Sequence, residues 1–304
     1  MYHYVREYDS RYPHFKFLDV RNFKKQIQFF SDKFDFVEKQ EWLDFINLGK
    51  MPKTSGKVVL TFDDAVNCHY QYVFPELRKR NLWGIFYIPT LPYTKNEILS
   101  VHKIHLLCGT FDGRTLMRVA TNLVTDDMIV NSEKDKFKEI IYSNQNNYAG
   151  VSEFKGLLNY LIDYVYRDNV IDSIANTLGY YFKAADYYIS WECLNEMKQK
   201  GMIIGSHTHS HPVMSKLDPK EQKQELEISF SILRDLIEGE SMTYCHPYGG
   251  FQSFNKHTID LVNKAGVKFS FNVESRDITA EDFVTSKQHL PRYDCNEFPY
   301  GTVS

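Results

Sequence analysis

The sequence predicts an α/β fold built around a parallel β-sheet. Two short apolar runs, KVVLTF (57–62) and MIIGS (202–206), and the segment MTYC (242–245) predict strands, and chemically reactive residues follow each of them. Helical patterns separate these runs, and alternation of strands with helices is typical of parallel sheets. The 304 residues are enough for one large domain or two smaller ones with a proper core.

The first part of the chain predicts a β-α-β unit. Residues 20–48 indicate a helix and its surroundings, because Phe23, Ile27, Phe30 and Phe34 recur at helical spacing. The run 57–62 is β-branched and reads as a buried strand. A helix is expected over 70–81, and WGIFYIP (83–89) is a second strand that Pro89 ends.

Residues 92–190 break this pattern. Polar, Asn-rich and Tyr-rich stretches alternate there with amphipathic pieces. We expect a largely helical insertion, with residues 1–91 and 191–304 forming the main domain. The insertion could serve as a lid, a substrate wall or the surface of a homo-oligomer.

The α/β pattern then resumes. A helix is expected near 190–200, before the strand that runs into HTHSH (207–211). Residues 219–238 carry apolar side chains at helical spacing, and a further helix is expected over 254–265. The segment VKFSFNV (267–273) reads as another strand.

Composition excludes several classes of protein. The net charge of −3 gives no broad basic surface for nucleic acid. The 21 Tyr and 22 Phe suit either sugar rings or an aromatic core, and we favour the core for most of them. Five dispersed Cys argue against a disulfide framework and a cysteine-based zinc site. No signal peptide or membrane-spanning run is apparent, so a cytoplasmic protein is expected.

Two acids, Asp63 and Asp64, follow the first predicted strand. Neighbouring side chains of a strand point to opposite faces, so one carboxylate can bind a metal while the other stays free as a base. Alone, the pair favours a solvated turn or a helix cap.

The segment HTHSH carries three His in five residues. The imidazoles of His207 and His211, four residues apart, can converge on one ion, while Thr208 holds the loop and His209 faces away. A His-rich surface loop is the alternative. One Asp with two His gives an oxygen and nitrogen ligand set with open positions, which suits Zn²⁺ or another divalent ion in hydrolysis of an amide or ester.

TFDDA (61–65), HTHSH (207–211) and CHPYGG (245–250), in this order, resemble the motifs of the polysaccharide deacetylase (NodB-homology) family of carbohydrate esterases. YHYV (2–5) and LPRYD (290–294) resemble its surface-polysaccharide branch. The resemblance implies a deformed (β/α) barrel of about seven strands.

The resemblance also implies roles for single residues. Asp63 matches the catalytic base, and Asp64, His207 and His211 match the metal ligands. Tyr248 matches the position whose backbone N–H helps to stabilise the oxyanion. The family's general acid is usually a late His in a Leu-x-His motif.

The sequence departs from the family at two places. Cys245 stands where the family often has the Arg that orients the base; Arg292 is our candidate replacement and Arg276 the second, with a surface ion pair as the alternative. No Leu-x-His motif is evident, so His246, His289 and His3 are each candidates for the acid, and we name His246 in the predicted site.

The expected function is hydrolysis of an N-acyl group, acetyl above all, from a sugar. With no export signal, the expected substrate is a nucleotide-linked or lipid-linked precursor of a surface glycan such as O-antigen or capsule. Deformylation, or cleavage of another non-peptide C–N bond, is the alternative reaction. A carbohydrate-binding protein with a relic metal site is the alternative class.

Overall fold

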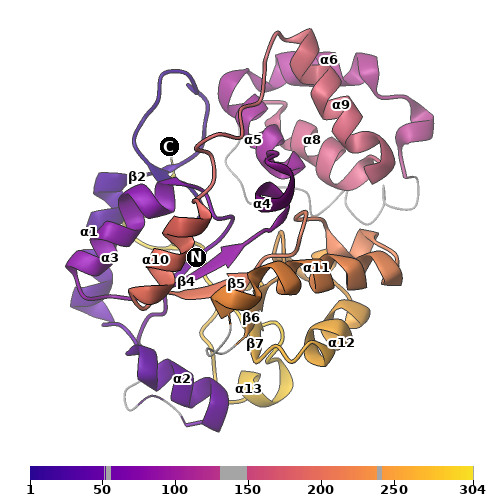
Figure 1. Ribbon diagram of the computed structural model, residues 1–304. Helices are drawn as coiled ribbons and strands as arrows, with labels where there is room; N and C mark the ends of the chain where they lie inside the picture. Colours follow the sequence, from indigo (N-terminus) through magenta and orange to yellow (C-terminus); the bar gives the residue numbers. More distant parts are fainter. Residues whose placement is uncertain (51, 53–55, 131–148, 238–241, 304) are drawn as a thin grey trace. The chain divides into compact units, whose positions relative to one another are not determined.

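The structure is a computed structural model that describes residues 1–50, 52, 56–130, 149–237 and 242–303 (Figure 1). The chain divides into two compact units. The first comprises Met1–Glu7, Phe17–Asn96 and Ala185–Ser304. The second comprises Tyr8–Lys16 and Glu97–Ala184, so it includes an N-terminal segment that the sequence analysis assigned to the main domain.

A five-stranded parallel sheet forms the centre of the first unit. Its strands lie in chain order: β3 (Thr61–Phe62), β4 (Ile85–Ile88), β5 (Ile203–Ser206), β6 (Thr243–Cys245) and β7 (Phe269–Phe271). A separate parallel pair is formed by β1 (Val5–Arg6) and β2 (Leu18–Asp19). The helices of this unit are α1 (Val20–Lys33), α2 (Lys39–Leu48), α3 (Phe74–Lys79), α4 (Leu91–Lys95), α10 (Trp191–Gln199), α11 (Pro219–Ile237), α12 (Lys256–Lys264) and α13 (Asp282–Thr285).

Single bridges extend the sheet at both edges. Tyr2 pairs in parallel with Phe62 of β3, and Leu290 pairs in parallel with Phe271 of β7. The predicted α/β fold with a parallel sheet is therefore confirmed. Seven strands and a closed barrel, which the family resemblance implies, are not confirmed, because the sheet has five strands in the described residues.

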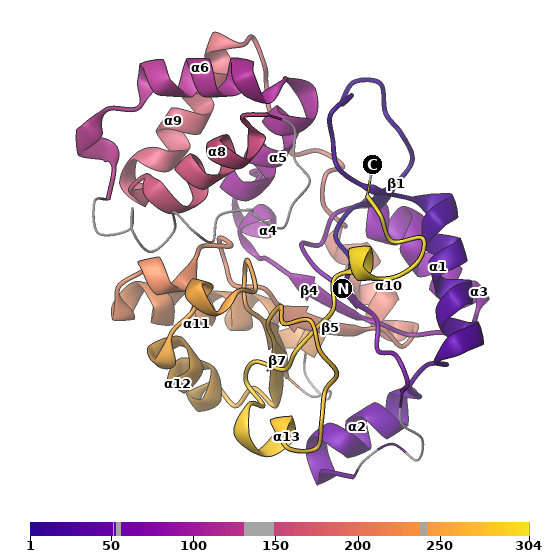
Figure 2. The same ribbon diagram turned by 180° about the vertical axis from the view of Figure 1, so that it is seen from behind.

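The two faces of the sheet bury different side chains. Phe86 and Ile88 of β4 pack in a core with residues of α1, α3 and α10. Ile85 and Tyr87 point to the other face and join a core with α2. This alternation is the period of two expected of a strand. In both views α1, α3 and α10 lie together, and so do α11 and α12 (Figures 1 and 2).

Two predicted elements are shorter than their sequence patterns. Of the run 57–62, only Thr61–Phe62 belongs to the sheet, because Val58 pairs instead with Phe36 between α1 and α2. The helix predicted over 70–81 divides into a π-helical turn (His69–Val73) and α3. Apolar runs show that a segment is buried, but not where its backbone changes partner.

Gly205 allows β5 to lie close to its neighbours. A Cβ atom there would meet the Tyr87 ring at 2.5 Å and the Thr243 methyl group at 2.7 Å. These two side chains are joined by a hydrogen bond between their hydroxyl oxygens, 2.9 Å apart. Since no side chain fits beneath that bond, glycine is required one residue before Ser206 and two before His207.

The second unit is helical in its described residues. It contains α5 (Ser100–Thr110), α6 (Gly113–Leu123), α8 (Val151–Gly156) and α9 (Tyr164–Thr177). Its core includes Leu107, Leu116, Phe154 and Ile171, one from each helix. Part of the predicted insertion, residues 131–148, lies outside the described residues. No helix in the described part of the chain has the length and apolar character to cross a bilayer.

Candidate active site

The polar residues predicted to carry the chemistry follow the carboxyl ends of β3, β5 and β6. The backbone at these positions is unusual, because Asp64, His211 and Tyr248 have φ of 82°, 57° and 63°. Such values are uncommon for residues with a side chain, and they persist only where surrounding structure imposes them. Strained backbone thus gathers where the ligands and the Tyr248 turn meet.

The structure brings Asp64, His207 and His211 together. Asp64 Oδ1 lies 3.6 Å from His207 Nε2 and 3.4 Å from His211 Nε2, and all three side chains are buried. Ligand atoms about 2.1 Å from a tetrahedral Zn²⁺ would be about 3.4 Å apart. The three residues therefore fit a divalent metal ion, with one carboxylate oxygen and two imidazole nitrogens as ligands.

The tautomer of His207 is set by its other ring nitrogen. Nδ1 lies 2.8 Å from the carbonyl oxygen of Cys245, so Nδ1 carries the hydrogen and Nε2 keeps its lone pair. Burial, with His211 as the next contribution, lowers the pKa of His207 to about 4. The ring is therefore neutral near pH 7, which is the form that binds a metal.

The loop between the two ligands is held by hydrogen bonds. Thr208 Oγ1 accepts a bond from the His211 N–H at 3.0 Å, as the sequence predicted for this hydroxyl. Glu225 of α11 accepts bonds from the N–H groups of His209 and Ser210, at 2.9 and 2.7 Å. Sequence analysis missed Glu225, since a glutamate within an amphipathic helix carries no local signal of such a role.

Asp63 faces a different partner. Arg292 donates from Nη1 to Asp63 Oδ1 at 2.9 Å and from Nη2 to Oδ2 at 2.8 Å. The remaining donors of the guanidinium bind the Asn272 carbonyl, the Thr61 hydroxyl and the Cys245 sulfur. The structure thus brings Arg292 to Asp63, whereas Arg276 binds Asp282 and Glu274 instead.

The arginine determines the charge of this carboxyl group. Burial by itself would raise the pKa of Asp63, but Arg292, followed by His207, outweighs burial and holds that pKa well below its ordinary value. Asp63 is therefore ionised at neutral pH despite being 2% exposed. An ionised carboxylate next to a candidate metal site can accept a proton.

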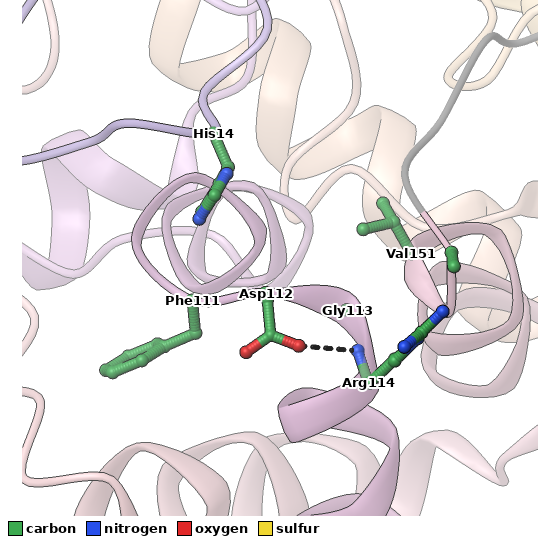
Figure 3. Close-up of a pocket in the computed structure, with 7 residues that line it drawn as sticks. His14, Phe111, Asp112, Gly113, Arg114 and Val151 are labelled. Carbon is green, nitrogen blue, oxygen red and sulfur yellow. Dashed lines mark hydrogen bonds between the residues drawn. The ribbon is translucent and has the colours of Figure 1, made fainter.

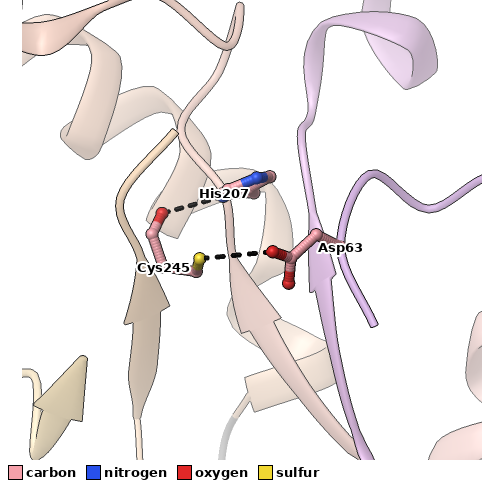
Figure 4. Close-up of side chains that lie close together, drawn as sticks. All are labelled: Asp63, His207 and Cys245. Carbon is pink, nitrogen blue, oxygen red and sulfur yellow. Dashed lines mark hydrogen bonds between the residues drawn. The ribbon is translucent and has the colours of Figure 1, made fainter. Parts of the chain in front are cut away.

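A second set of potential ligands consists of Asp63, His207 and Cys245, which lie at the ends of β3, β5 and β6 (Figure 4). Arg292 Nη2 lies 3.0 Å from Cys245 Sγ, where it already supplies positive charge. Burial raises the pKa of the Cys245 thiol, so the sulfur stays protonated and is a poor metal ligand. Of the two sets, the one with Asp64 fits a metal.

Tyr248 and His209, which lie near the candidate metal ligands, contact different residues. Tyr248 places its ring 5.1 Å from that of His211, centroid to centroid. His209 is half-buried and its Nδ1 lies 2.9 Å from the Thr90 hydroxyl oxygen, which agrees with the expectation that it faces away from the ligands.

The position of His246 does not fit the predicted acid. Its ring stacks on Phe254 at a centroid distance of 3.9 Å, and its Nε2 lies 2.8 Å from the carbonyl oxygen of Gln288. Burial lowers its pKa to about 3. Cys245 directs its sulfur toward Asp63, so the next side chain along the strand points to the other face. His289 also packs against Phe254.

The second unit has a pocket of its own, of about 290 Å³ (Figure 3). It is lined by His14, Phe111, Asp112, Gly113, Arg114, Ala149 and Val151. The Asp112 carboxylate accepts bonds from the N–H groups of Arg114 and Thr115 and so caps α6. The carboxylate of Asp112 thus has a structural role, and we assign no chemistry to this pocket.

Comparison with known proteins supports the predicted resemblance. Residues 164–270 match the model of the polysaccharide deacetylase family. A curated relative from Geobacillus stearothermophilus, an uncharacterised 30.6 kDa protein in the fumA 3′ region, is 27% identical over 134 residues. That match covers 44% of this chain and 46% of the relative, so the chain spans about half the length of that protein.

Solved structures with the same fold include three deacetylases. The Streptococcus pyogenes deacetylase PplD, in complex with acetate, matches with a TM-score of 0.57 and 14% identity over 96% of this chain and 88% of that one. BC0361, a polysaccharide deacetylase from Bacillus cereus, matches with a TM-score of 0.52 and 13% identity over 96% of this chain and 61% of that one. The de-N-acetylase from Aggregatibacter actinomycetemcomitans matches with a TM-score of 0.50 and 16% identity over 96% of this chain and 92% of that one. These matches show the fold, and with the family match they confirm the resemblance to polysaccharide deacetylases.

Proposed function

Because this chain is related to the polysaccharide deacetylases, we propose that it is a metal-dependent hydrolase that removes an acetyl group from an N-acetylated sugar. One observation carries the proposal: the buried Asp64, His207 and His211 set fits a divalent ion, and the ionised Asp63 follows the same strand. Substitutions of these residues distinguish an active hydrolase from a protein that keeps the fold but has lost its activity.

The oxygen and nitrogen ligands favour Zn²⁺ or another late divalent ion. When bound, the ion would supply a polarised water and a Lewis acid for the acyl oxygen. Three protein ligands leave coordination positions open, which is typical of catalytic rather than structural sites.

The residues of the chain divide the remaining work. Asp63 takes the proton of the attacking water, and Arg292 holds both carboxylate oxygens of Asp63 in place. The backbone N–H of Tyr248 stabilises negative charge on the acyl oxygen, by the family resemblance.

We further propose a nucleotide-linked or lipid-linked sugar as substrate, in the synthesis of a surface polysaccharide such as O-antigen or capsule. YHYV (2–5) and LPRYD (290–294), which resemble that branch of the family, support this narrower proposal. A cytoplasmic location belongs to the same proposal.

The test combines metal analysis with product detection. The purified chain, loaded with Zn²⁺, is incubated with nucleotide-linked and lipid-linked N-acetyl sugars and with N-formyl analogues, and acetate and formate are measured. Acetate release that the Asp63→Asn variant lacks is the expected result. Formate alone would favour the alternative reaction, and sugar binding without release of either acid would favour a binding protein.

A further inference from the structure

Gln26 places a polar amide inside an apolar core. The residue lies on α1 and its side chain is fully buried. Phe23 and Phe30, about one turn before and after it on the helix, belong to that core. A buried amide is costly unless its hydrogen bonds are made, whereas an apolar side chain of similar size carries no such cost. The contacts of the amide, rather than its packing, therefore account for a glutamine at this position.

The amide oxygen of Gln26 holds the segment that pairs beside Asp63. Tyr2 donates from its hydroxyl group to Gln26 Oε1 at 2.6 Å. Tyr2 also pairs in parallel with Phe62, and the rings of the two residues stack at a centroid distance of 5.3 Å. The Tyr2 N–H donates to the Thr61 carbonyl at 2.9 Å, and the Tyr2 carbonyl accepts from the Asp63 N–H at 3.0 Å. Gln26 thus binds the residue that holds the backbone of the candidate base.

The amide nitrogen of Gln26 holds the turn that follows Arg292. Gln26 Nε2 donates to the carbonyl oxygens of Cys295 and Pro299, each at 3.0 Å. The turn closes tightly around this amide, because a Cβ atom at Gly301 would lie 2.4 Å from Gln26 Nε2 and 1.6 Å from the Cys295 carbonyl oxygen. Cys295 is three residues beyond Arg292. The amide therefore fixes the backbone close to the arginine.

These contacts form a closed circuit around the candidate base. One side runs from Asp63 through Tyr2 to Gln26. The other side runs from Gln26 to Cys295 and along the chain to Arg292. Arg292 then completes the circuit by binding both carboxylate oxygens of Asp63.

We propose that Gln26 is a positioning residue for Asp63, an assignment that rests on the proposed function. One amide sets the distance between the sheet edge that carries Asp63 and the turn that carries Arg292. Without that amide the turn can shift, and the guanidinium then holds the carboxylate in a different place. A base that moves by about 1 Å transfers the water's proton much more slowly, so Gln26 acts on the reaction through Arg292.

Gln26→Met tests this role, because it keeps a side chain of similar length and removes the bonds of the amide. With zinc bound and an N-acetyl sugar as substrate, kcat should fall by about 10- to 100-fold, while KM and zinc content stay within about twofold of wild type. Gln222→Met is the matched control. Gln222 is also buried, donates to the Leu217 carbonyl at 3.1 Å and accepts from the Thr258 hydroxyl at 2.7 Å. Its kcat should stay within about twofold of wild type, although its melting temperature falls as well.

A second measurement separates positioning from a general effect on the fold. If Gln26 acts through Arg292, then Gln26→Met should lower kcat by less than about twofold in an Arg292→Lys enzyme. Losses that multiply would overturn the inference, and so would an unchanged kcat of Gln26→Met in the wild-type background. In both cases an active wild type upholds the proposed function. A zinc-loaded wild type that releases no acetate would overturn the function and the inference together.

Tyr2→Phe gives the same test if Gln26→Met does not fold. It keeps the ring that stacks on Phe62 and removes the bond to Gln26 Oε1. Its kcat should fall by about twofold or more in the wild-type background, the equivalent of one hydrogen bond, and should not fall further in the Arg292→Lys enzyme. A loss of equal size in both backgrounds would contradict the role of Gln26.

Discussion

Arg292 and Asp63 form a buried ion pair through two hydrogen bonds of 2.9 and 2.8 Å. Both side chains are at most 4% exposed. Cys245 leaves room for this contact at the position where the family resemblance led us to expect an arginine. The guanidinium thus reaches the carboxylate from a segment 229 residues further along the chain.

The first prediction concerns this pair. Lysine keeps the charge of Arg292 but cannot bind both carboxylate oxygens, so Arg292→Lys should lower turnover by about 10- to 100-fold with metal content unchanged. Arg292→Ala leaves Asp63 buried without its cation and should lower the free energy of unfolding by about 3–5 kcal/mol. Turnover, metal analysis and urea denaturation measure these effects. An Arg292→Lys enzyme as active as wild type would contradict the orienting role.

The second prediction separates the two acids. Asp63→Asn cannot accept the water's proton, so turnover should fall by about a hundredfold or more while metal stays bound. Asp64→Asn replaces a charged ligand and should lower both metal affinity and rate. Acetate release, metal content and melting temperature are compared for the two variants. If Asp63 were only a cap, its replacement would cost about 1 kcal/mol and leave turnover nearly intact.

The third prediction concerns metal binding. One divalent ion per chain is expected, because Asp64, His207 and His211 form one set of converging ligands. His207→Ala and His211→Ala should each lose most of the ion after dialysis, as measured by elemental analysis. His257→Ala, away from these residues in the sequence, should keep it. Full occupancy in both ligand variants would refute the assignment.

The fourth prediction tests the support of the ligand loop. Glu225→Ala removes the carboxylate oxygen that accepts both backbone N–H groups and the oxygen that binds the Ser210 hydroxyl, so the loop should loosen and zinc affinity should fall by about tenfold or more. Glu227→Ala on the same helix is the control, since that side chain is 66% exposed. Competition with a chelator measures both affinities, and equal values would exclude the role of Glu225.

The fifth prediction uses the buried, neutral ring of His246. Its pKa is about 6.5 when unfolded and lowered to about 3 when folded, so the unfolded chain binds more protons between these values. Stability should be complete above pH 6.5 and fall as pH drops toward 3. Between pH 7 and 4.5 the metal-free wild type should lose about 2–3 kcal/mol more than His246→Gln, by urea denaturation. Turnover of His246→Gln near pH 7 should persist, and its loss would restore His246 as the acid.

Local motifs in the sequence predicted most of the candidate site. Asp63 and Asp64 are adjacent, and His207 and His211 lie on one short loop, so each pair could be found locally, and the family resemblance joined the two pairs into one site. Arg292 could be named because a cation was missing at Cys245. The role of the helical unit, as lid, substrate wall or oligomer surface, stays a prediction.

Other features were out of reach for different reasons. His3 was one of three candidate acids, but its place 4.0 Å from Asp63 depends on pairing of segments about sixty residues apart, which no local pattern reports. The role of His246 as the acid stays a prediction; its ring stacks on Phe254, and strand alternation after Cys245 directs it to the face away from Asp63. The strand at 57–62 was predicted too long, since apolar character marks burial and not pairing.

The bridges at the two edges of the sheet have a consequence for folding. Asp63 receives one neighbour from residues 2–3 and another from residue 292, so closing the largest loop in this unit is needed to complete its surroundings. Closing long loops costs entropy before any contact compensates it, so such contacts form late. Until Arg292 binds the Asp63 carboxylate, burying that charge opposes the pairing of residues 2–3 with β3. The pairing of residues 2–3 and the binding of Arg292 therefore form one cooperative step. During refolding, helical signal should therefore appear well before activity.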